Sequence, residues 1–415
     1  MSRCIYCDEA KPFTDEHVVS AGLGGDDKGW MLRDCVCGDC NTKVFSKLEA
    51  KFLRSSPVAI ARLFHQEKTR GRGRKTGAPT LNTQQTLMED RAKGIFLNQD
   101  LRQGFEPVIL PQVVLESPGT LSAHMQDVAT GRAFLSSLQA SLAGDLLLIR
   151  KIKVGLEVAY EHTPLTWNAT TEEYVASPVQ ISAKAPNTKD GVVWVEELIM
   201  PSTARSASRL TPRIYRRNQG QLVCAVVDLN DARGVLTLLR RNGGAVVVPE
   251  GAVPIEIESE GVHLKLAMSI AVHDRVLTKI GINLAAYLFD PDFVRRPEFA
   301  ETKSYALTGK GHVLKIHADR HPSNQLGEAN QLPGVHVFCI TPANSGNDDS
   351  RLLSVMISLY GGPFESFALA ELPKGTPELN DPIIILVFYN ENRIERFSMN
   401  DLHQMAEADG LGSVN

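Results

Sequence analysis

Two pairs of cysteines with the spacing Cys-x-x-Cys stand near the start of the chain. Cys4 and Cys7 form the first pair, and Cys37 and Cys40 form the second. Four thiolates at this spacing suit one tetrahedral zinc ion, and a site closed by four sulfur ligands has no open position for a substrate. We therefore predict a structural zinc site. Cys35 is an alternative ligand, although Cys37-x-x-Cys40 forms the better metal-binding knuckle.

Between the two pairs lie an acid–histidine pair, Glu16-His17, and a double glycine, Gly24-Gly25; Asn41 follows the last cysteine directly. Imidazole exchanges a proton readily near neutral pH, and carboxylate and amide oxygens are hard ligands suited to Mg²⁺ or Mn²⁺. Such residues can hold a second, catalytic metal ion and activate water. We interpret the double glycine as a tight turn rather than a phosphate-binding loop.

The full pattern consists of Cys4-Ile-Tyr-Cys7, Glu16-His17-Val18, Gly24-Gly25 and Cys37-Gly-Asp-Cys40-Asn41. It resembles the zinc-bound branch of the HNH (ββα-metal) endonucleases, over roughly residues 3–60 of the 415. The resemblance implies that His17 is the general base and that Glu16 and Asn41 bind a catalytic divalent ion. It also implies hydrolysis of DNA to 3′-hydroxyl and 5′-phosphate ends, in bacterial restriction or phage defence.

One position departs from the pattern of that family. The middle asparagine, which orients the histidine, is not evident, and Asp34 is the nearest residue that could accept an imidazole N–H. For three further acids, Asp26, Asp27 and Glu49, we expect solvated positions.

A basic, glycine-rich stretch follows this region. Residues 51–75 contain eight Lys or Arg and one Glu, a local charge of +7, in a chain whose net charge is −4. We predict a flexible arm over residues 66–80 in which Arg70, Arg72, Arg74 and Lys75 contact phosphates of the nucleic-acid backbone; a merely solvated linker is the alternative. A second histidine group, His312, His317 and His321, is predicted to be a polar loop rather than a metal site.

Composition places the chain among globular proteins. Hydrophobic residues make up 43% and charged residues 22%. Five of the seven cysteines fall within the first 40 residues, which favours metal binding in a reducing cytoplasm over a disulfide framework. We see neither a signal peptide nor a run of 18 apolar residues, so we expect no membrane segment.

The predicted fold class is α+β, with an N-terminal zinc-bound ββα-metal module and a larger, mainly antiparallel β-rich region. The expected domains are 1–65 (nuclease module), 66–80 (arm), 81–245 and 246–415 (α+β regions). Helices are expected at Asp39 to His65 with a break at Pro57, Phe134 to Leu142, Ala232 to Arg241 and Asp274 to Phe289. Strands are expected near Val335, Leu353, Phe364, Ile383 and Arg393.

These observations predict a metal-dependent DNA endonuclease with structural zinc. Two alternatives remain: a non-catalytic nucleic-acid-binding zinc module, because the middle asparagine is missing, and an RNA-cleaving toxin. The region after residue 81 has no catalytic signature; we expect it to bind a regulatory partner, a ligand, DNA or a second copy of the chain.

Overall fold

The computed structural model describes residues 3–70, 76–83, 85–102, 106–117, 120–154, 157–186, 191–202, 208–251, 261–266, 268–316, 326, 332–377, 382–398 and 400–401. Of residues 69, 70, 76, 77, 117, 154 and 157 it describes the backbone alone.

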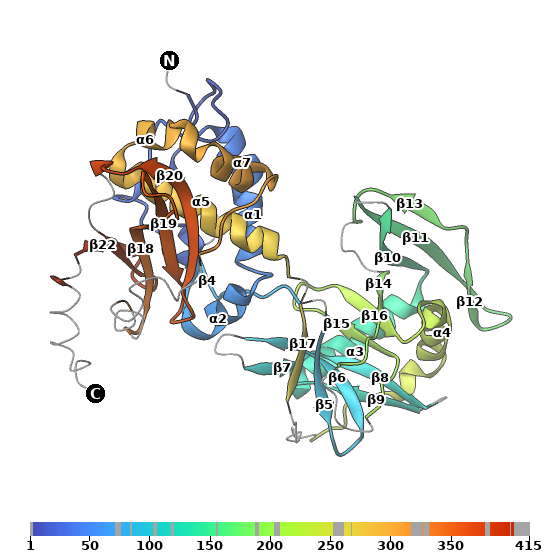
Figure 1. Cartoon of the computed structure of the whole chain (residues 1–415). Helices are drawn as coiled ribbons and strands as arrows, with labels where there is room; N and C mark the ends of the chain where they lie inside the picture. Colours follow the sequence, from blue (N-terminus) through green and yellow to red (C-terminus); the bar gives the residue numbers. More distant parts are fainter. Residues whose placement is uncertain are drawn as a thin grey trace. The chain divides into compact units, whose positions relative to one another are not determined.

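The chain divides into two compact units (Figure 1). Unit 1 contains the described residues of Met1–Asn82 and Ala267–Asn415, and unit 2 contains those of Thr83–Arg102 and Glu106–Leu266. This division differs from the domain boundaries expected from sequence, because the N-terminal module and the C-terminal region belong to one unit. Unit 2 is an insertion within that unit.

The N-terminal part of unit 1 begins with two short strands. Strand β1 (Glu16–His17) pairs antiparallel with β2 (Met31–Leu32), and the 3₁₀ turn η1 (Ala21–Leu23) lies between them. A π-helical segment, η2 (Asp39–Phe45), then continues into α1 (Ser46–Phe52).

Helix α2 (Pro57–His65) follows after the predicted break. Pro57 occupies the first helical turn, where the missing N–H costs no hydrogen bond. The Ser56 hydroxyl donates to the carbonyl of Phe52 at 2.7 Å, so it closes the preceding helix. Beyond α2, β3 (Thr69–Arg70) pairs antiparallel with β4 (Thr76–Gly77). Both short strands lie within the predicted arm, residues 66–80.

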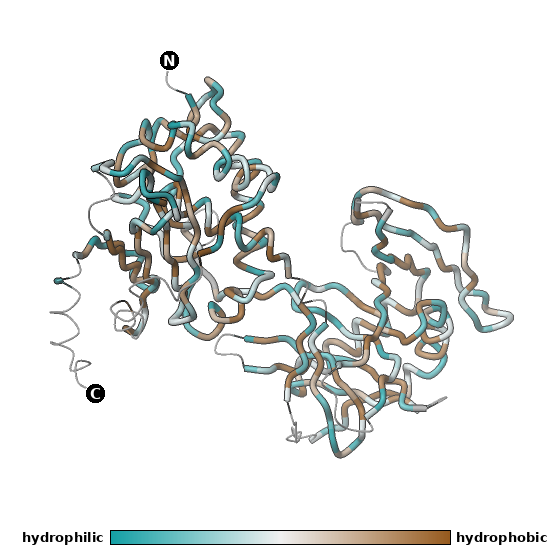
Figure 2. Tube along the Cα trace, viewed as in Figure 1, coloured by the Kyte–Doolittle hydropathy of each residue, from teal (hydrophilic) through white to brown (hydrophobic). Residues whose placement is uncertain are grey.

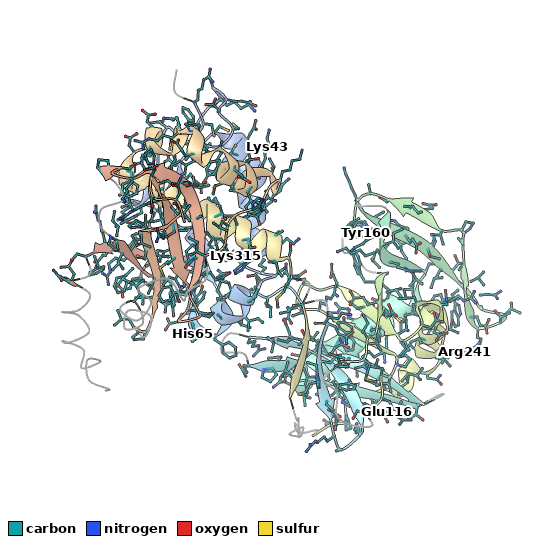
Figure 3. The ribbon with its side chains drawn as sticks, in the orientation of Figure 1. Lys43, His65, Glu116, Tyr160, Arg241 and Lys315 are labelled. Carbon is teal, nitrogen blue, oxygen red and sulfur yellow. The ribbon has the colours of Figure 1, made fainter. Side chains whose placement is uncertain are left out.

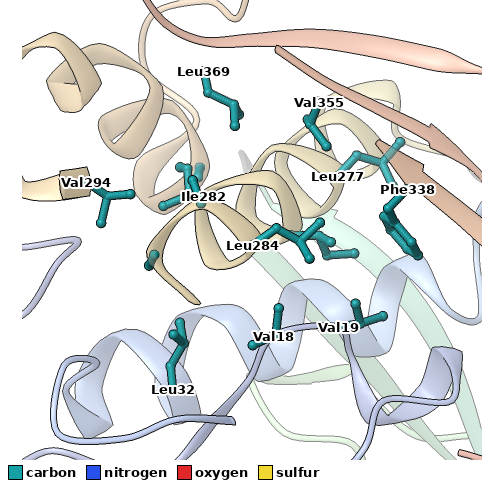
Figure 4. Packing of buried hydrophobic residues seen from close by; sticks show 14 of the residues in the cluster. Val18, Val19, Leu32, Leu277, Ile282, Leu284, Val294, Phe338, Val355 and Leu369 are labelled. Carbon is teal, nitrogen blue, oxygen red and sulfur yellow. The ribbon is translucent and has the colours of Figure 1, made fainter. Parts of the chain in front are cut away.

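Helix α5 (Ile270–Phe289) is the central element of unit 1 (Figure 4). It starts one turn earlier than predicted, where the Ser269 hydroxyl accepts from the N–H of Val272. Val18 and Val19 of the N-terminal part lie on one side of the helix, and Val355 and Leu369 lie on the other. A helix that is apolar over most of its circumference must be covered on several sides, and α5 joins both parts in one core.

The C-terminal part of unit 1 is a five-stranded antiparallel sheet with the order β20-β19-β18-β21-β22. Its strands are β18 (Val335–Asn344), β19 (Ser350–Ser358), β20 (Glu365–Pro373), β21 (Ile383–Phe388) and β22 (Arg393–Phe397). All five predicted strand regions are therefore confirmed. The remaining helical elements of this part are α6 (Pro291–Arg295), η7 (Pro297–Phe299) and α7 (Ala300–Thr308). Figure 2 shows hydrophobic stretches along these strands and α5, in agreement with their buried side chains.

Unit 2 contains a nine-stranded mixed sheet with the order β12-β11-β10-β14-β16-β15-β8-β9, and β13 pairs with β11. The pairs β10–β14 and β14–β16 are parallel and the others antiparallel, so the antiparallel-rich prediction holds with these two exceptions. Its strands are β8 (Gln112–Ser117), β9 (Thr120–His124), β10 (Leu146–Val154), β11 (Glu157–Asn168), β12 (Glu173–Ala176), β13 (Gln180–Ser182), β14 (Val192–Glu197), β15 (Arg213–Arg216) and β16 (Leu222–Val226).

A second sheet of unit 2 has the order β17-β5-β6-β7. Its strands are β5 (Gln85–Asp90), β6 (Ile95–Leu101), β7 (Pro107–Ile109) and β17 (Val262–Lys265). The helical elements of the unit are α3 (Val128–Ala143), η5 (Leu229–Asp231), α4 (Ala232–Asn242) and η6 (Gly243–Ala245). Both helices predicted in this region are confirmed. Over the described ranges of the chain, no helix has the length and apolar character needed to cross a bilayer.

The close packing of α5 on the C-terminal sheet depends on Gly281. A Cβ atom there would lie 2.7 Å from Val355 Cγ1 and 2.9 Å from Leu369 Cδ2. We predict that Gly281→Val lowers the free energy of unfolding of unit 1 by about 1–3 kcal/mol, because an overpacked core must shift. Thermal and denaturant unfolding measure this change.

Gly234→Val is the matched control. Gly234 also lies inside a helix, α4, but a Cβ atom there meets nothing within 4 Å. The free energy of unfolding of the Gly234→Val protein should change by less than roughly 0.5 kcal/mol, since valine and glycine differ little in helix propensity. Equal effects of the two substitutions would show that α5 is not tightly packed at Gly281.

Candidate functional site

The four predicted cysteines come together in unit 1. The sulfur atoms of Cys4, Cys7, Cys37 and Cys40 all lie within 4.8 Å of one another. Cys7 Sγ is 3.7 Å from Cys37 Sγ, and the backbone N–H of Cys37 donates to Cys4 Sγ at 3.4 Å. Backbone N–H groups that support sulfur ligands are typical of metal-binding knuckles. The cluster can hold a metal ion, and four thiolates suit zinc best.

Cys35 does not belong to this cluster. Its side chain is buried, and its carbonyl accepts a hydrogen bond from the N–H of Ile5 at 2.9 Å. Burial raises the pKa of the Cys35 thiol to about 11. The sulfur positions therefore favour Cys37 and Cys40, and not Cys35, as the second pair of metal ligands.

Neighbouring thiols of the cluster shift one another's pKa. The hydrogen bond with Cys40 lowers the pKa of Cys4, and the same contact raises the pKa of Cys40. Burial raises the pKa of Cys7 to about 11. A metal ion must displace the thiol protons, so metal binding should weaken as the pH falls.

His17 ends strand β1 with its ring partly exposed, at 29%. The ring Nε2 lies 2.6 Å from Asp27 Oδ1, and no residue in the described ranges hydrogen-bonds to Nδ1. The acid that faces the histidine is therefore Asp27, whose exposed side chain agrees with the predicted solvated position but whose pairing with His17 was not predicted. Asp34, the candidate from sequence, is exposed and has a positive φ of 55°.

The loop that carries Asp27 is shaped by the double glycine. Gly24 has φ +87°, and a Cβ atom there would lie 2.4 Å from the backbone of Tyr389. A Cβ atom on Gly25 would lie 2.0 Å from the carbonyl oxygen of Val19. Only glycine fits these close approaches. The tight-turn interpretation of Gly24-Gly25 is thus confirmed.

Glu16 is placed differently from the expectation for a metal ligand. Alternate residues of a strand face opposite sides. The Glu16 side chain accordingly faces the interior, where it is 5% exposed and forms an ion pair with Lys279 of α5. Lys279 also lies 2.7 Å from Glu49, the second acid for which a solvated position was expected. The Glu16 carboxylate is therefore engaged by a protein cation and does not fit a shared site with an exposed His17.

Asn41, the other expected ligand, is partly exposed. It lies in the first turn of η2, and its side-chain Nδ2 donates to the Asp15 carbonyl at 2.9 Å and to Thr14 Oγ1 at 3.1 Å. This leaves the side-chain oxygen for another partner. Lys43, two residues further along η2, extends from the surface of unit 1 (Figure 3).

Other residues singled out from sequence remain untested by the fold. Arg72, Arg74 and Lys75 lie outside the described residues, as does the side chain of Arg70. His317 and His321 also lie outside them, while His312 is exposed and lies 3.5 Å from Glu301.

A separate group lines a cavity of about 440 Å³ near the start of α5. His273 Nε2 is 2.6 Å from Glu365 Oε1, and Lys315, labelled in Figure 3, lies 2.7 Å from Asp274 Oδ1. The ligand atoms of His273, Asp274 and Glu365 lie within 4.8 Å of one another. Sequence reasoning missed this group, because its members come from distant segments. Each carboxylate already has a partner, since Glu365 hydrogen-bonds to the His273 imidazole and Asp274 forms an ion pair with Lys315.

No family model, curated protein or solved structure matches the chain.

The cysteine cluster yields a direct prediction. Freshly purified protein should contain one zinc ion per chain, and Cys40→Ala should lose the zinc together with the fold of residues 3–60, since a structural metal contributes directly to folding. Elemental analysis and circular dichroism measure both effects. Cys35→Ala is the matched control and should keep its zinc. Zinc-free wild-type protein, or loss of zinc in Cys35→Ala alone, would contradict the assignment.

Proposed function

We propose that the chain is an endonuclease that hydrolyses phosphodiester bonds of DNA, with His17 as the general base. The observation that carries the proposal is the His17–Asp27 pair, at 2.6 Å, in the segment between the two cysteine pairs of the four-cysteine cluster. The order of strand, loop, strand and helix around it supports a ββα-metal arrangement. The cysteine spacing supports the zinc-bound branch of that family.

The geometry gives each nitrogen of the His17 ring a separate task. The Asp27 carboxylate accepts a hydrogen bond from Nε2–H and holds the ring in one tautomer. The lone pair of Nδ1 then remains to accept a proton from the attacking water. Removal of that proton makes the water oxygen a nucleophile toward phosphorus. Asp27 therefore takes the orienting role of the missing middle asparagine.

The predicted ligands of a catalytic divalent ion fit only in part. Glu16 does not fit, because it is buried against Lys279, whereas the accessible side-chain oxygen of Asn41 does. A bound Mg²⁺ or Mn²⁺ would supply charge stabilisation at the scissile phosphate. We assign no step of the reaction to Glu16.

DNA is the proposed substrate, and the basic arm is the proposed contact for its backbone. Arg70, Arg72, Arg74 and Lys75 follow the nuclease-like region in the sequence. Positive charge raises affinity for any phosphate backbone without sequence selectivity. By resemblance, the setting is bacterial restriction or phage defence, with cutting controlled through the C-terminal region.

A non-catalytic binding module is the second candidate. The buried ion pair of Glu16 favours it, since an acid that is withdrawn from the surface cannot bind a catalytic ion. Absence of cleavage on DNA and RNA with every metal ion tried, together with retained binding, would support this candidate.

The cleavage test uses plasmid DNA with Mg²⁺ or Mn²⁺. His17→Ala should lower the rate by roughly 10²- to 10⁴-fold, the usual cost of losing a general base, while zinc content and DNA binding stay unchanged. His312→Ala, an exposed histidine of the same unit, is the control and should cut normally. A His17→Ala protein that cuts as fast as wild type would refute the assignment.

The arm is tested by salt dependence. Neutralising Arg70, Arg72, Arg74 and Lys75 together should weaken DNA binding and reduce the slope of log affinity against log salt by up to roughly 0.9 for each phosphate that is no longer neutralised. Fluorescence anisotropy at several salt concentrations measures this slope. An unchanged slope would show that the stretch is only a linker.

A further inference from the structure

Three polar residues of α5 stand one helical turn apart and face the hairpin β1–β2. They are Lys279, Asn283 and Tyr287, which we call the α5 polar row. Residues four apart share one face of a helix, so all three side chains meet the same neighbouring segment. Each contacts a different point of the hairpin that carries His17 and Asp27.

Lys279 holds the acid beside the histidine. Its side chain is 1% exposed, and its ammonium pairs with both Glu16 and Glu49. Burial opposes the charge, but the two carboxylates outweigh it and raise the pKa of Lys279 above its usual value. A buried charge without such partners would be strongly unfavourable, so this arrangement fixes the position of Glu16.

Asn283 holds the backbone of the histidine itself. It is 0% exposed, and its Nδ2 donates to the carbonyl oxygen of His17 at 2.9 Å. Its Oδ1 accepts from the hydroxyl of Tyr6 at 2.6 Å. Tyr6 stands between Cys4 and Cys7. The metal-binding knuckle, the asparagine and His17 are thus joined by consecutive hydrogen bonds.

Tyr287 holds the loop on the other side of Asp27. Its hydroxyl donates to the carbonyl of Gly29 at 2.8 Å, and its ring stacks on Trp30 with 4.6 Å between centroids. Gly29 is two residues beyond Asp27. The polar row therefore contacts the chain on both sides of the His17–Asp27 pair.

We propose that Lys279, Asn283 and Tyr287 are positioning residues of the nuclease site, and that the Lys279 ammonium takes the place at Glu16 that a catalytic metal ion was expected to occupy. This inference rests on the proposed function for its catalytic part. The site around His17 is therefore completed by helix α5, in which Lys279 lies 263 positions after Glu16. Because Tyr6 lies between Cys4 and Cys7 and donates to Asn283, the position of Asn283 also depends on the zinc site.

The test combines a spectroscopic readout with cleavage. Histidine ¹⁵N NMR of the full-length, zinc-loaded protein reports the tautomer of His17, which is assigned by its loss in His17→Gln. Wild type should show a single Nε2–H tautomer. Asn283→Leu and Tyr287→Phe should shift the signal toward a mixture of tautomers, since the hairpin loses an anchor on either side of Asp27. Thr278→Val, a buried α5 residue that bonds only to the Asp274 carbonyl of its own helix, should leave the signal unchanged.

Cleavage kinetics separate positioning from metal binding. A misplacement of about 1 Å in an active site can cost roughly 10²-fold in rate. Lys279→Met and Asn283→Leu should therefore lower the cleavage rate by up to that factor, with the half-saturating Mg²⁺ concentration unchanged. Glu16→Gln should behave in the same way. A raised Mg²⁺ requirement in Glu16→Gln alone would restore the metal-ligand role and overturn the proposal.

Two further outcomes are informative. If Lys279→Met fails to fold, Tyr287→Phe still decides, because it removes one hydroxyl at a partly exposed position and keeps the ring stack. If wild-type protein cuts no nucleic acid, the proposed function fails, but the NMR result still tests the positioning role. An unaltered His17 signal in both Asn283→Leu and Tyr287→Phe would refute that role.

Discussion

The buried ammonium of Lys279 between Glu16 and Glu49 is the interaction on which unit 1 depends. A charge removed from water requires partners of opposite sign, and here they come from two elements of the N-terminal part, β1 and α1. The apolar core around α5 supplies most of the attraction between these segments, but apolar contact has no direction. The ion pairs and the hydrogen bonds of Asn283 set the register of the hairpin on the helix.

This constraint explains why the N-terminal cysteine-rich segment is not a separate domain. A segment of about 60 residues buries too little surface to be stable alone and needs a metal or a partner. In unit 1, four thiols can hold a metal ion, and helix α5 is the partner that covers Val18 and Val19. Unit 2 is inserted in the sequence between the two halves of this structure, and the described residues of the site all belong to unit 1.

Local features were predictable from the sequence, and distant contacts were not. The cysteine cluster follows from spacing alone, and the break at Pro57 and the course of α5 follow from backbone chemistry and apolar periodicity. The position of Glu49 was misjudged and the pairing of the exposed Asp27 with His17 was not predicted, because an isolated acid in a polar segment gives no sign of its partner. The partner of Glu16, Lys279, lies 263 positions away, and nothing in the sequence connects the two residues. The same long separation concealed the domain division.

Amide hydrogen exchange in the β1–β2 hairpin, residues 16–32, tests most directly whether α5 holds the strand that carries His17. The measurement compares the full chain with an isolated fragment of residues 1–82, both loaded with zinc. If α5 holds the hairpin, its amides should exchange slowly in the full chain and fast in the fragment, even though the fragment keeps its four cysteines. Equal protection in the two proteins would show that the zinc-bound segment organises the hairpin by itself, and would contradict the role of α5.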